Sequence, residues 1–254
     1  MQASVDFNFT YLNTTNQLLI KRNVFENGIG PQIIKVNIDT KEENIISSEN
    51  FSTIIAGDNK LFGFKRIVEN TNLTSINLVE INYENASTIS TMEVFEALDN
   101  APDNDKTGIS SILYSQSTNE LLIPRRVSFI ANAIDELIKI NADTGIKVTI
   151  PINHYKAITV GRNGRLFAIK RTLDTNFDVI FNGVVEIDIN SGNEIDIIAE
   201  FDEYSFSSEI IFLNDSNELL IDVGILYKIN VDTKNISIFN VENGFYSFRS
   251  INIY

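Results

Sequence analysis

The chain of 254 residues has no cysteine and no tryptophan, and it contains a single histidine and four prolines. Without thiols it can form no disulfide, thiolate nucleophile or cysteine metal site. No apolar run approaches the roughly 20 residues that cross a bilayer as a helix, so no membrane span is predicted. The start, MQASVDFNFT, lacks the basic and apolar segments of an export signal.

Basic residues are also scarce, with 20 Lys and Arg against 34 Asp and Glu, which gives a formal charge of −14. Such a charge repels phosphate backbones and anionic membrane surfaces, so we expect no nucleic-acid binding. We expect a secreted, periplasmic or cell-surface protein, on the hypothesis that an export signal once preceded Met1, and a cytoplasmic location stays open. A composition of 43% hydrophobic and 21% charged residues is typical of a folded globular chain.

One phrase recurs five times in the chain, starting at residues 33, 78, 137, 184 and 226. Apolar and polar residues alternate in it with the period of a half-buried strand, and turn-forming residues such as Asp-Thr-Gly close it. The phrase therefore predicts a strand, a tight turn and a second strand. Its copies read IIKVNIDTK, LVEINYENA, LIKINADTG, VVEIDINSG and LYKINVDTK.

Two further strand-like segments precede each copy, so each unit is predicted to hold four strands. The units cover approximately residues 5–50, 51–96, 109–153, 154–202 and 205–241, with an insertion at 97–108. Four antiparallel strands at this spacing are typical of a propeller blade.

We therefore predict an all-β fold, a single β-propeller domain over residues 1–254 built from four-stranded antiparallel blades. Five full repeats are followed by an extra C-terminal strand at 244–254, and the ring is five- or six-bladed. A tandem of β-sandwiches and a β-helix are weaker alternatives, because a sandwich is not expected to repeat one hairpin five times and β-helix coils are usually shorter.

The phrase resembles the repeat of bacterial propellers of the YVTN and quinoprotein-like superfamily, most closely at Leu137–Gly145 and Val184–Gly192. The resemblance implies the fold and covers nearly the whole chain, but it reports a hairpin and no site. The chain lacks the Trp-Asp dipeptide of WD40 repeats and the Gly-Gly pair of kelch repeats. It also lacks the tryptophan motifs of quinone-dependent propeller enzymes, and no cofactor is predicted.

A basic doublet ends the second strand of four units: Lys21-Arg22, Lys65-Arg66, Arg125-Arg126 and Lys170-Arg171. The fifth unit has Asp222-Val223 instead. Long connections follow the doublets, and loops on one face of a rigid scaffold commonly bind ligands. We therefore predict a loop-rich basic rim that attracts an anion. The candidate ligand-binding residues are Arg22, Lys65, Arg66, Arg125, Arg126, Lys170, Arg171 and His154, the last in a predicted connection, PINHYK.

The alternative reading of the doublets is structural, with the cations paired to acids such as Glu80, Glu186 and Asp135. His154 is the histidine that a His-dependent nucleophilic site would have to use, but no G-x-S-x-G motif supports such a site. In the insertion, Asp103, Asp105 and Thr107 have the alternate spacing of a calcium loop. The twelfth position of that loop would be Tyr114 where a Glu is needed, so an acidic surface loop is the default reading.

These observations favour a non-catalytic binding or interaction propeller that recognises an anionic small molecule, glycan or protein. One alternative is a metal-dependent hydrolase or lactonase-like propeller with a site in its central channel. Another is a purely structural surface repeat. The sequence does not specify an oligomeric state.

Overall fold

The computed structural model describes residues 7–12, 16–22, 32–47, 49, 51–57, 60–69, 72–98, 107–109, 111–127, 134–175, 179–201, 209–213, 216–222 and 225–238. Within these residues the elements are β-strands, apart from the single 3-10 turn η1 (Arg162–Gly164). The predicted all-β class is therefore confirmed. No helix in the described part of the chain is long and apolar enough to cross a membrane.

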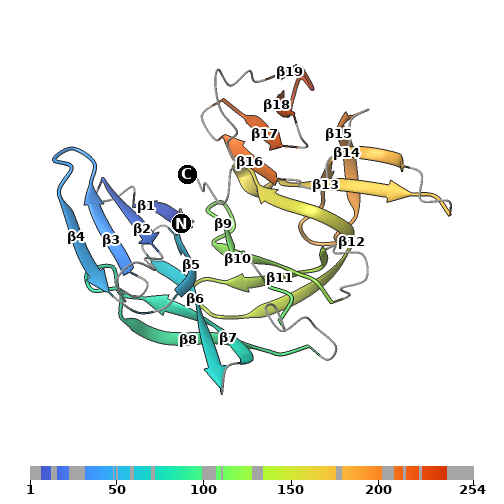
Figure 1. Cartoon of the computed structure of the whole chain (residues 1–254). Coiled ribbons are helices and arrows are strands. Elements are labelled where there is room, and N and C mark those ends of the chain that lie inside the picture. The colour runs from blue at the N-terminus through green and yellow to red at the C-terminus, as the bar shows by residue number, and fades with distance from the viewer. Residues whose placement is uncertain are drawn as a thin grey trace, which may run out of the picture. The chain divides into compact units, whose positions relative to one another are not determined.

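The chain divides into two compact units, the first ending at Tyr114 and the second beginning at Ser115. The first unit holds two four-stranded antiparallel sheets in which neighbouring strands follow one another in sequence (Figure 1). One sheet contains β1 (Phe7–Leu12), β2 (Gln17–Arg22), β3 (Gln32–Asn37) and β4 (Glu43–Ser47). The other contains β5 (Phe51–Ala56), β6 (Leu61–Glu69), β7 (Asn72–Ile81) and β8 (Thr88–Glu96).

The second unit holds a four-stranded sheet and, apart from Leu113 and Tyr114 of its first strand, a seven-stranded sheet, both antiparallel and again in sequence order. The seven-stranded sheet contains β9 (Leu113–Ser115), β10 (Glu120–Arg125), β11 (Ile134–Asn141), β12 (Lys147–Val160), β13 (Leu166–Leu173), β14 (Val179–Ile187) and β15 (Glu194–Glu200). The last sheet contains β16 (Glu209–Leu213), β17 (Glu218–Asp222), β18 (Leu226–Asn230) and β19 (Ile236–Ile238).

A single long strand, β12, joins the two halves of the seven-stranded sheet (Figure 1). Its residues 147–151 pair with β11, and from Tyr155 onward it pairs with β13. The prediction that PINHYK forms a connection between units was wrong, because His154 lies inside this strand. Pro151 is tolerated there because β12 pairs with β11 alone at that point, and an edge position needs no N–H toward the open side.

The five predicted hairpins form in the same way. The first residue of each turn, Asn37, Asn82, Asn141, Asp188 or Asn230, accepts hydrogen bonds from the backbone N–H groups two and three residues later. Its backbone N–H also donates to the carbonyl five residues on. This side-chain mimic of a turn is the reason why Asn and Asp are favoured at that position.

Two of the expected long connections are mostly strand. β6 and β7 extend as a hairpin whose pairing continues to Glu69 and Asn72, and β13 pairs with β14 as far as Leu173 and Val179. Alternating apolar residues such as Ile67 and Ile76 continue the strand pattern beyond the basic doublet. The predicted loop-rich rim is therefore partly β-hairpin in the described chain.

Each unit is held together by apolar contacts between the facing sheets. In the first unit, Leu19 and Ile33 pack with Phe51, Ile54 and other residues of the second sheet. In the second unit, strands β13–β15 pack against the last sheet, and the rings of Phe167 and Phe212 stack at 5.8 Å. Burial of this kind is the main driving force for assembling the sheets.

Candidate functional site

The first cation of three basic doublets is paired with a carboxylate. Lys65 Nζ lies 2.7 Å from Glu49 Oε2, and Lys170 Nζ bonds both carboxylate oxygens of Glu194 at 2.7 and 2.9 Å. Arg125 lies 3.8 Å from Glu136 on the neighbouring strand. These side chains are therefore engaged by the protein itself, and their contribution is at least partly structural.

The first doublet follows a related pattern. Lys21 is 8% exposed and donates through Nζ to the carbonyl of Ser52, which belongs to the next sheet. Its neighbour Arg22 pairs with Phe7 and Gln32 in the backbone register, but its side chain lies outside the described part of the structure.

Two of the acids that the sequence suggested as partners of the doublets, Glu80 and Glu186, pair with other cations. Glu80 pairs with Lys60, and Glu186 forms a two-pronged bond with Arg165. Arg165 also reaches Asp232 in the last sheet at 2.8 Å, and these two acids raise the pKa of its guanidinium. The ion pairs of Glu80 and Glu186 therefore involve Lys60 and Arg165, which are not members of the basic doublets.

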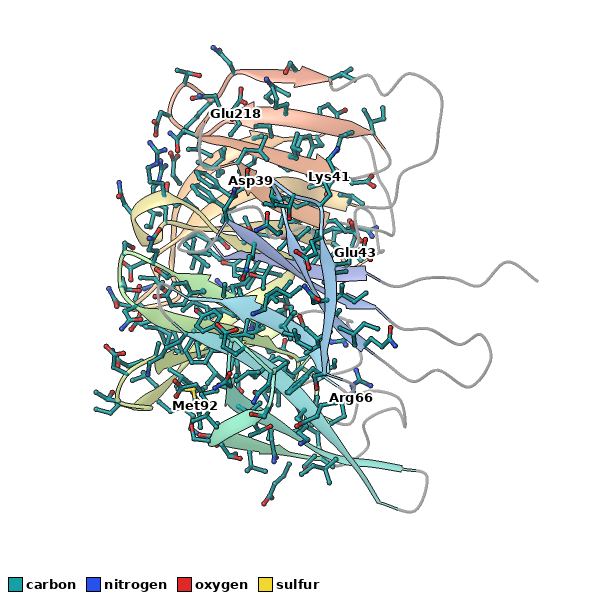
Figure 2. The ribbon with its side chains drawn as sticks, turned by 90° about the vertical axis from the view of Figure 1, so that its left-hand side faces the viewer. Asp39, Lys41, Glu43, Arg66, Met92 and Glu218 are labelled. Atoms are coloured by element: carbon teal, nitrogen blue, oxygen red, sulfur yellow. The ribbon has the colours of Figure 1, made fainter. Side chains whose placement is uncertain are left out.

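The second cations of the doublets have different surroundings. Arg66 is exposed on β6, in the sheet that also carries Met92 on β8 (Figure 2). Arg126 and Arg171 are half-buried and belong to the second unit. Because neighbouring residues of a strand point to opposite faces, Arg66 and Arg171 point away from the face that holds the paired first cations, whereas Arg126 follows the end of β10.

The Arg125-Arg126 doublet is connected to His154 through Asp135. The backbone N–H of Val127 donates to Asp135 Oδ2 at 2.9 Å, and the other carboxylate oxygen of Asp135 lies 2.5 Å from Nδ1 of His154. The side chain of Asp135 is 14% exposed, whereas that of His154 is 71% exposed. Opposite Asp135 the register of β11 and β12 shifts, so that this irregularity places His154 at the sheet surface.

A second irregularity in β12 brings two cations together. The pairing with β13 passes from Tyr155 opposite Lys170 to Ala157 opposite Ile169, which leaves Lys156 as an extra, bulged residue. Lys156 has a lowered pKa, first because of partial burial and then because of the positive charge of Arg171. A bound anion would stabilise two cations in such a partly desolvated position.

Tyr155, between His154 and Lys156, is completely buried and faces the other way. Its hydroxyl donates to Glu194 at 3.2 Å, beside the ammonium of Lys170. Burial and the charge of Glu194 raise the pKa of this hydroxyl, so it stays protonated and holds its bond. Tyr155 and Lys170 therefore fix β12 directly beside the bulged Lys156.

The adjoining last sheet carries carboxylates at the corresponding position. Glu209 stands directly opposite Asp222 in the register of β16 and β17. At the same position three other repeats have an aromatic residue opposite a basic one: Phe7 opposite Arg22, Phe51 opposite Lys65 and Tyr155 opposite Lys170. β16 packs on β12 and β13. A structural interpretation of the cations of the seven-stranded sheet therefore competes with ligand binding. In that interpretation they pair with the carboxylates of the last sheet.

The calcium prediction lies mostly outside the described chain, because Asp103 and Asp105 fall in residues 101–106. Thr107 is completely buried, and its hydroxyl accepts a bond from the N–H of Ile109 at 3.4 Å. In the described residues, no group of three or more His, Cys, Asp or Glu side chains could hold a metal ion.

Sequence reasoning selected Arg126, His154 and Arg171. In the seven-stranded sheet Arg126 follows the end of β10, His154 lies within β12 and Arg171 lies within β13. It missed Lys156, whose role depends on a bulge. The signal was present as the tripeptide His154-Tyr155-Lys156, with a large, mostly apolar residue between two polar ones, but the register shift at Lys156 comes from pairing with other strands.

Comparison with known proteins agrees with this architecture. No protein-family model and no curated protein matches the sequence. In structure, the chain superposes on TolB from Acinetobacter baumannii with a TM-score of 0.61 and 11% identity, covering 93% of this chain and 54% of TolB. It superposes on an oligogalacturonate lyase in complex with manganese with a TM-score of 0.60 and 12% identity, covering 91% of this chain and 63% of the lyase.

An oligogalacturonate lyase from Vibrio parahaemolyticus gives a TM-score of 0.55 and 10% identity over 94% of this chain and 79% of the lyase. These neighbours have β-propeller-type folds. The chain therefore has a propeller-like fold. It spans about half the length of TolB and less than two thirds of the manganese-bound lyase. At such low identity the likeness concerns the fold alone.

Proposed function

We propose that the chain is a non-catalytic binding module that recognises an anionic ligand at the part of the seven-stranded sheet that carries Arg126, His154, Lys156 and Arg171. We call this set the cationic joint. The observation that carries the proposal is the β-bulge at Lys156, where partial burial and then the positive charge of Arg171 lower the pKa of the Lys156 ammonium. A bound carboxylate, sulfate or phosphate would relieve that repulsion and could accept two charge-assisted hydrogen bonds.

We also propose a finer architecture, in which the chain forms five four-stranded blades and the third and fourth blades share β12. The five hairpins with the same hydrogen bonding support this proposal. An experimental structure in which these hairpins are not related by rotation about one axis would contradict it.

An anionic glycan is the first ligand to test, since two of the structural neighbours are oligogalacturonate lyases and a chain of carboxylates suits a row of cations. Binding of oligogalacturonate would be measured by isothermal titration calorimetry at low salt, with a neutral oligosaccharide of the same length as control. Sulfate and phosphate complete the panel, so that a preference for a free anion over a glycan is visible.

The deciding comparison uses three single variants. Lys156→Gln and Arg171→Gln each remove one charge of the joint, and each is expected to weaken binding about five- to tenfold because one charge-assisted hydrogen bond is lost. Lys147→Gln removes the same charge from the exposed far end of the same strand and should leave the affinity unchanged.

The competing structural role predicts another pattern. If Lys156 and Arg171 served the last sheet alone, both variants would lower the unfolding temperature and the wild-type protein would bind no member of the panel. Absence of binding by the wild-type protein, or equal affinities of all three variants, would refute the proposed function.

A further inference from the structure

The hairpin of β13 and β14 extends beyond the neighbouring strands of its sheet (Figure 1). On one side, the pairing of β13 with β12 ends at Lys170, which stands opposite Tyr155. On the other side, the N–H of Phe201 donates the last hydrogen bond to β14, at the carbonyl of Asn182. Within the described residues the hairpin is therefore two strands wide from Arg171 onward. Such a narrow ribbon has little apolar area of its own to bury.

The two faces of this ribbon differ in chemistry. The ammonium of Lys170 lies 5.6 Å from the centre of the Phe181 ring, so these two side chains share one face. Phe181 stands opposite Thr172, the next residue of β13 on that face. Arg171 and Leu173 therefore share the other face, at a spacing of about 7 Å along the strand.

The end of the ribbon carries exposed apolar side chains. Leu173 stands opposite Val179, and directly opposite residues of a strand pair project from the same face. The register shift next to this pair leaves Ile180 as the extra residue, so the bulge lies on β14 and the alternation along β13 is unbroken. Leu173 and Val179 are 40% and 42% exposed, and Ile180 is 65% exposed.

One face thus combines a cation with an apolar pair. Arg171 is half-buried, and its positive charge acts on Lys156 of the neighbouring strand. Leu173 and Val179 follow toward the end of the ribbon. A wholly polar anion would use the cations alone, whereas an anion with an apolar substituent of matching length could also cover the apolar pair.

We propose that the cationic joint binds amphipathic anions, with the negative group at Arg171 and an apolar chain along Leu173 and Val179. This inference rests on the proposed function and deepens it, since it names the class of ligand. A chain on this open face keeps one side in water. Each methylene should therefore raise the affinity by about twofold, which corresponds to about half of the free energy of complete burial.

Acetate, butanoate and hexanoate are suitable probes because all three are ionised at pH 7.5 and differ only in chain length. Their dissociation constants would be measured at fixed ionic strength by NMR titration of the backbone amides, a method that suits weak binding. For the wild-type protein we expect an increase in affinity of about ten- to twentyfold from acetate to hexanoate. The largest shifts are expected at residues 171–173 and 179–181.

Single variants separate the apolar contact from the charge. Val179→Thr replaces a methyl group by a hydroxyl and keeps the β-branched shape, so it should weaken hexanoate binding about two- to fourfold and leave acetate binding unchanged. Val148→Thr is the matched control, because Val148 is a 52% exposed residue of β12 in the same sheet, and it should change neither affinity. Arg171→Gln should weaken the binding of all three carboxylates by a similar factor.

The outcomes distinguish this inference from the proposed function. If sulfate, phosphate or oligogalacturonate binds and hexanoate binds no more tightly than acetate, the inference is refuted and the binding function stands. An equal gain with chain length in the wild-type protein and in Val179→Thr would place the apolar contact elsewhere and also refute the inference. If no anion of either panel binds, both proposals are wrong.

Discussion

Gly183 lies on β14 directly opposite Lys170 and provides a sharp test of how tightly the site is supported. A Cβ atom at this position would lie 2.2 Å from the carbonyl oxygen of Ala199 on β15 and 2.9 Å from Cζ of Phe181. The first distance is about 1 Å shorter than the contacts that close-packed interiors allow, and a backbone oxygen cannot rotate away. The substitution Gly183→Ala therefore requires β14 and β15 to separate.

We expect Gly183→Ala to lower the free energy of unfolding by about 3 kcal/mol, the upper part of the range for overpacking, because two hydrogen-bonded strands must move. The matched control is Gly145→Ala in the same unit. Gly145 has φ +68 and no atom within 4 Å of a new Cβ, so its cost is purely conformational, about 1 kcal/mol.

Urea denaturation followed by far-ultraviolet circular dichroism would compare both variants with the wild-type protein. The expected difference of about 2 kcal/mol follows from the steric contact alone. If Gly183→Ala were no more destabilising than Gly145→Ala, the close approach of β14 and β15 would be wrong, and with it the packing behind the cationic joint.

Three further predictions concern the turns and ion pairs. Asp188 has a pKa below its ordinary value, mainly because the backbone N–H of Ser191 donates to it, so its stabilisation is present above pH 4 and is lost as the pH falls through the lowered pKa. The Asp188→Asn variant should keep these hydrogen bonds. When the pH is lowered from 6 to 3, the unfolding temperature of the variant should therefore fall less than that of the wild-type protein. An equal fall in both proteins would contradict this prediction. Asn230→Ala removes two turn hydrogen bonds and should cost about 1 kcal/mol in urea denaturation; a neutral effect would refute the role of the side chain. Arg165→Gln breaks the bonds to Glu186 and Asp232 and should cost about 1 to 2 kcal/mol, less in high salt, whereas salt-independent destabilisation would indicate lost packing instead.

The parts of the fold that the sequence predicted correctly depend on local chemistry. An Asn or Asp that begins a turn accepts hydrogen bonds from the backbone N–H groups two and three residues later, whatever its tertiary surroundings. A short stretch of sequence around Asn82 or Asn141 is therefore enough to predict the hairpin. The alternation of apolar residues gave the strands for the same reason.

The errors and omissions arose where pairing between distant strands decides the outcome. Pro151 and Asn153 look like turn residues, yet β12 continues through them because it exchanges one partner strand for another at that point. The bulge at Lys156 lies at the same exchange of partners. Composition could indicate that cations end the strands, but it could not indicate that Lys65 and Lys170 are engaged by Glu49 and Glu194.

The continuity of β12 also has a mechanical consequence. Where two sheets are joined by a flexible loop, the strands of one sheet can separate without moving the other. Here the connection is the continuous fourteen-residue strand β12, so a displacement of β11 is transmitted along its backbone to β13. We expect the amide protons on both sides of His154 to exchange with solvent cooperatively, at similar rates. A ligand bound at the cationic joint should slow exchange in both halves of the seven-stranded sheet.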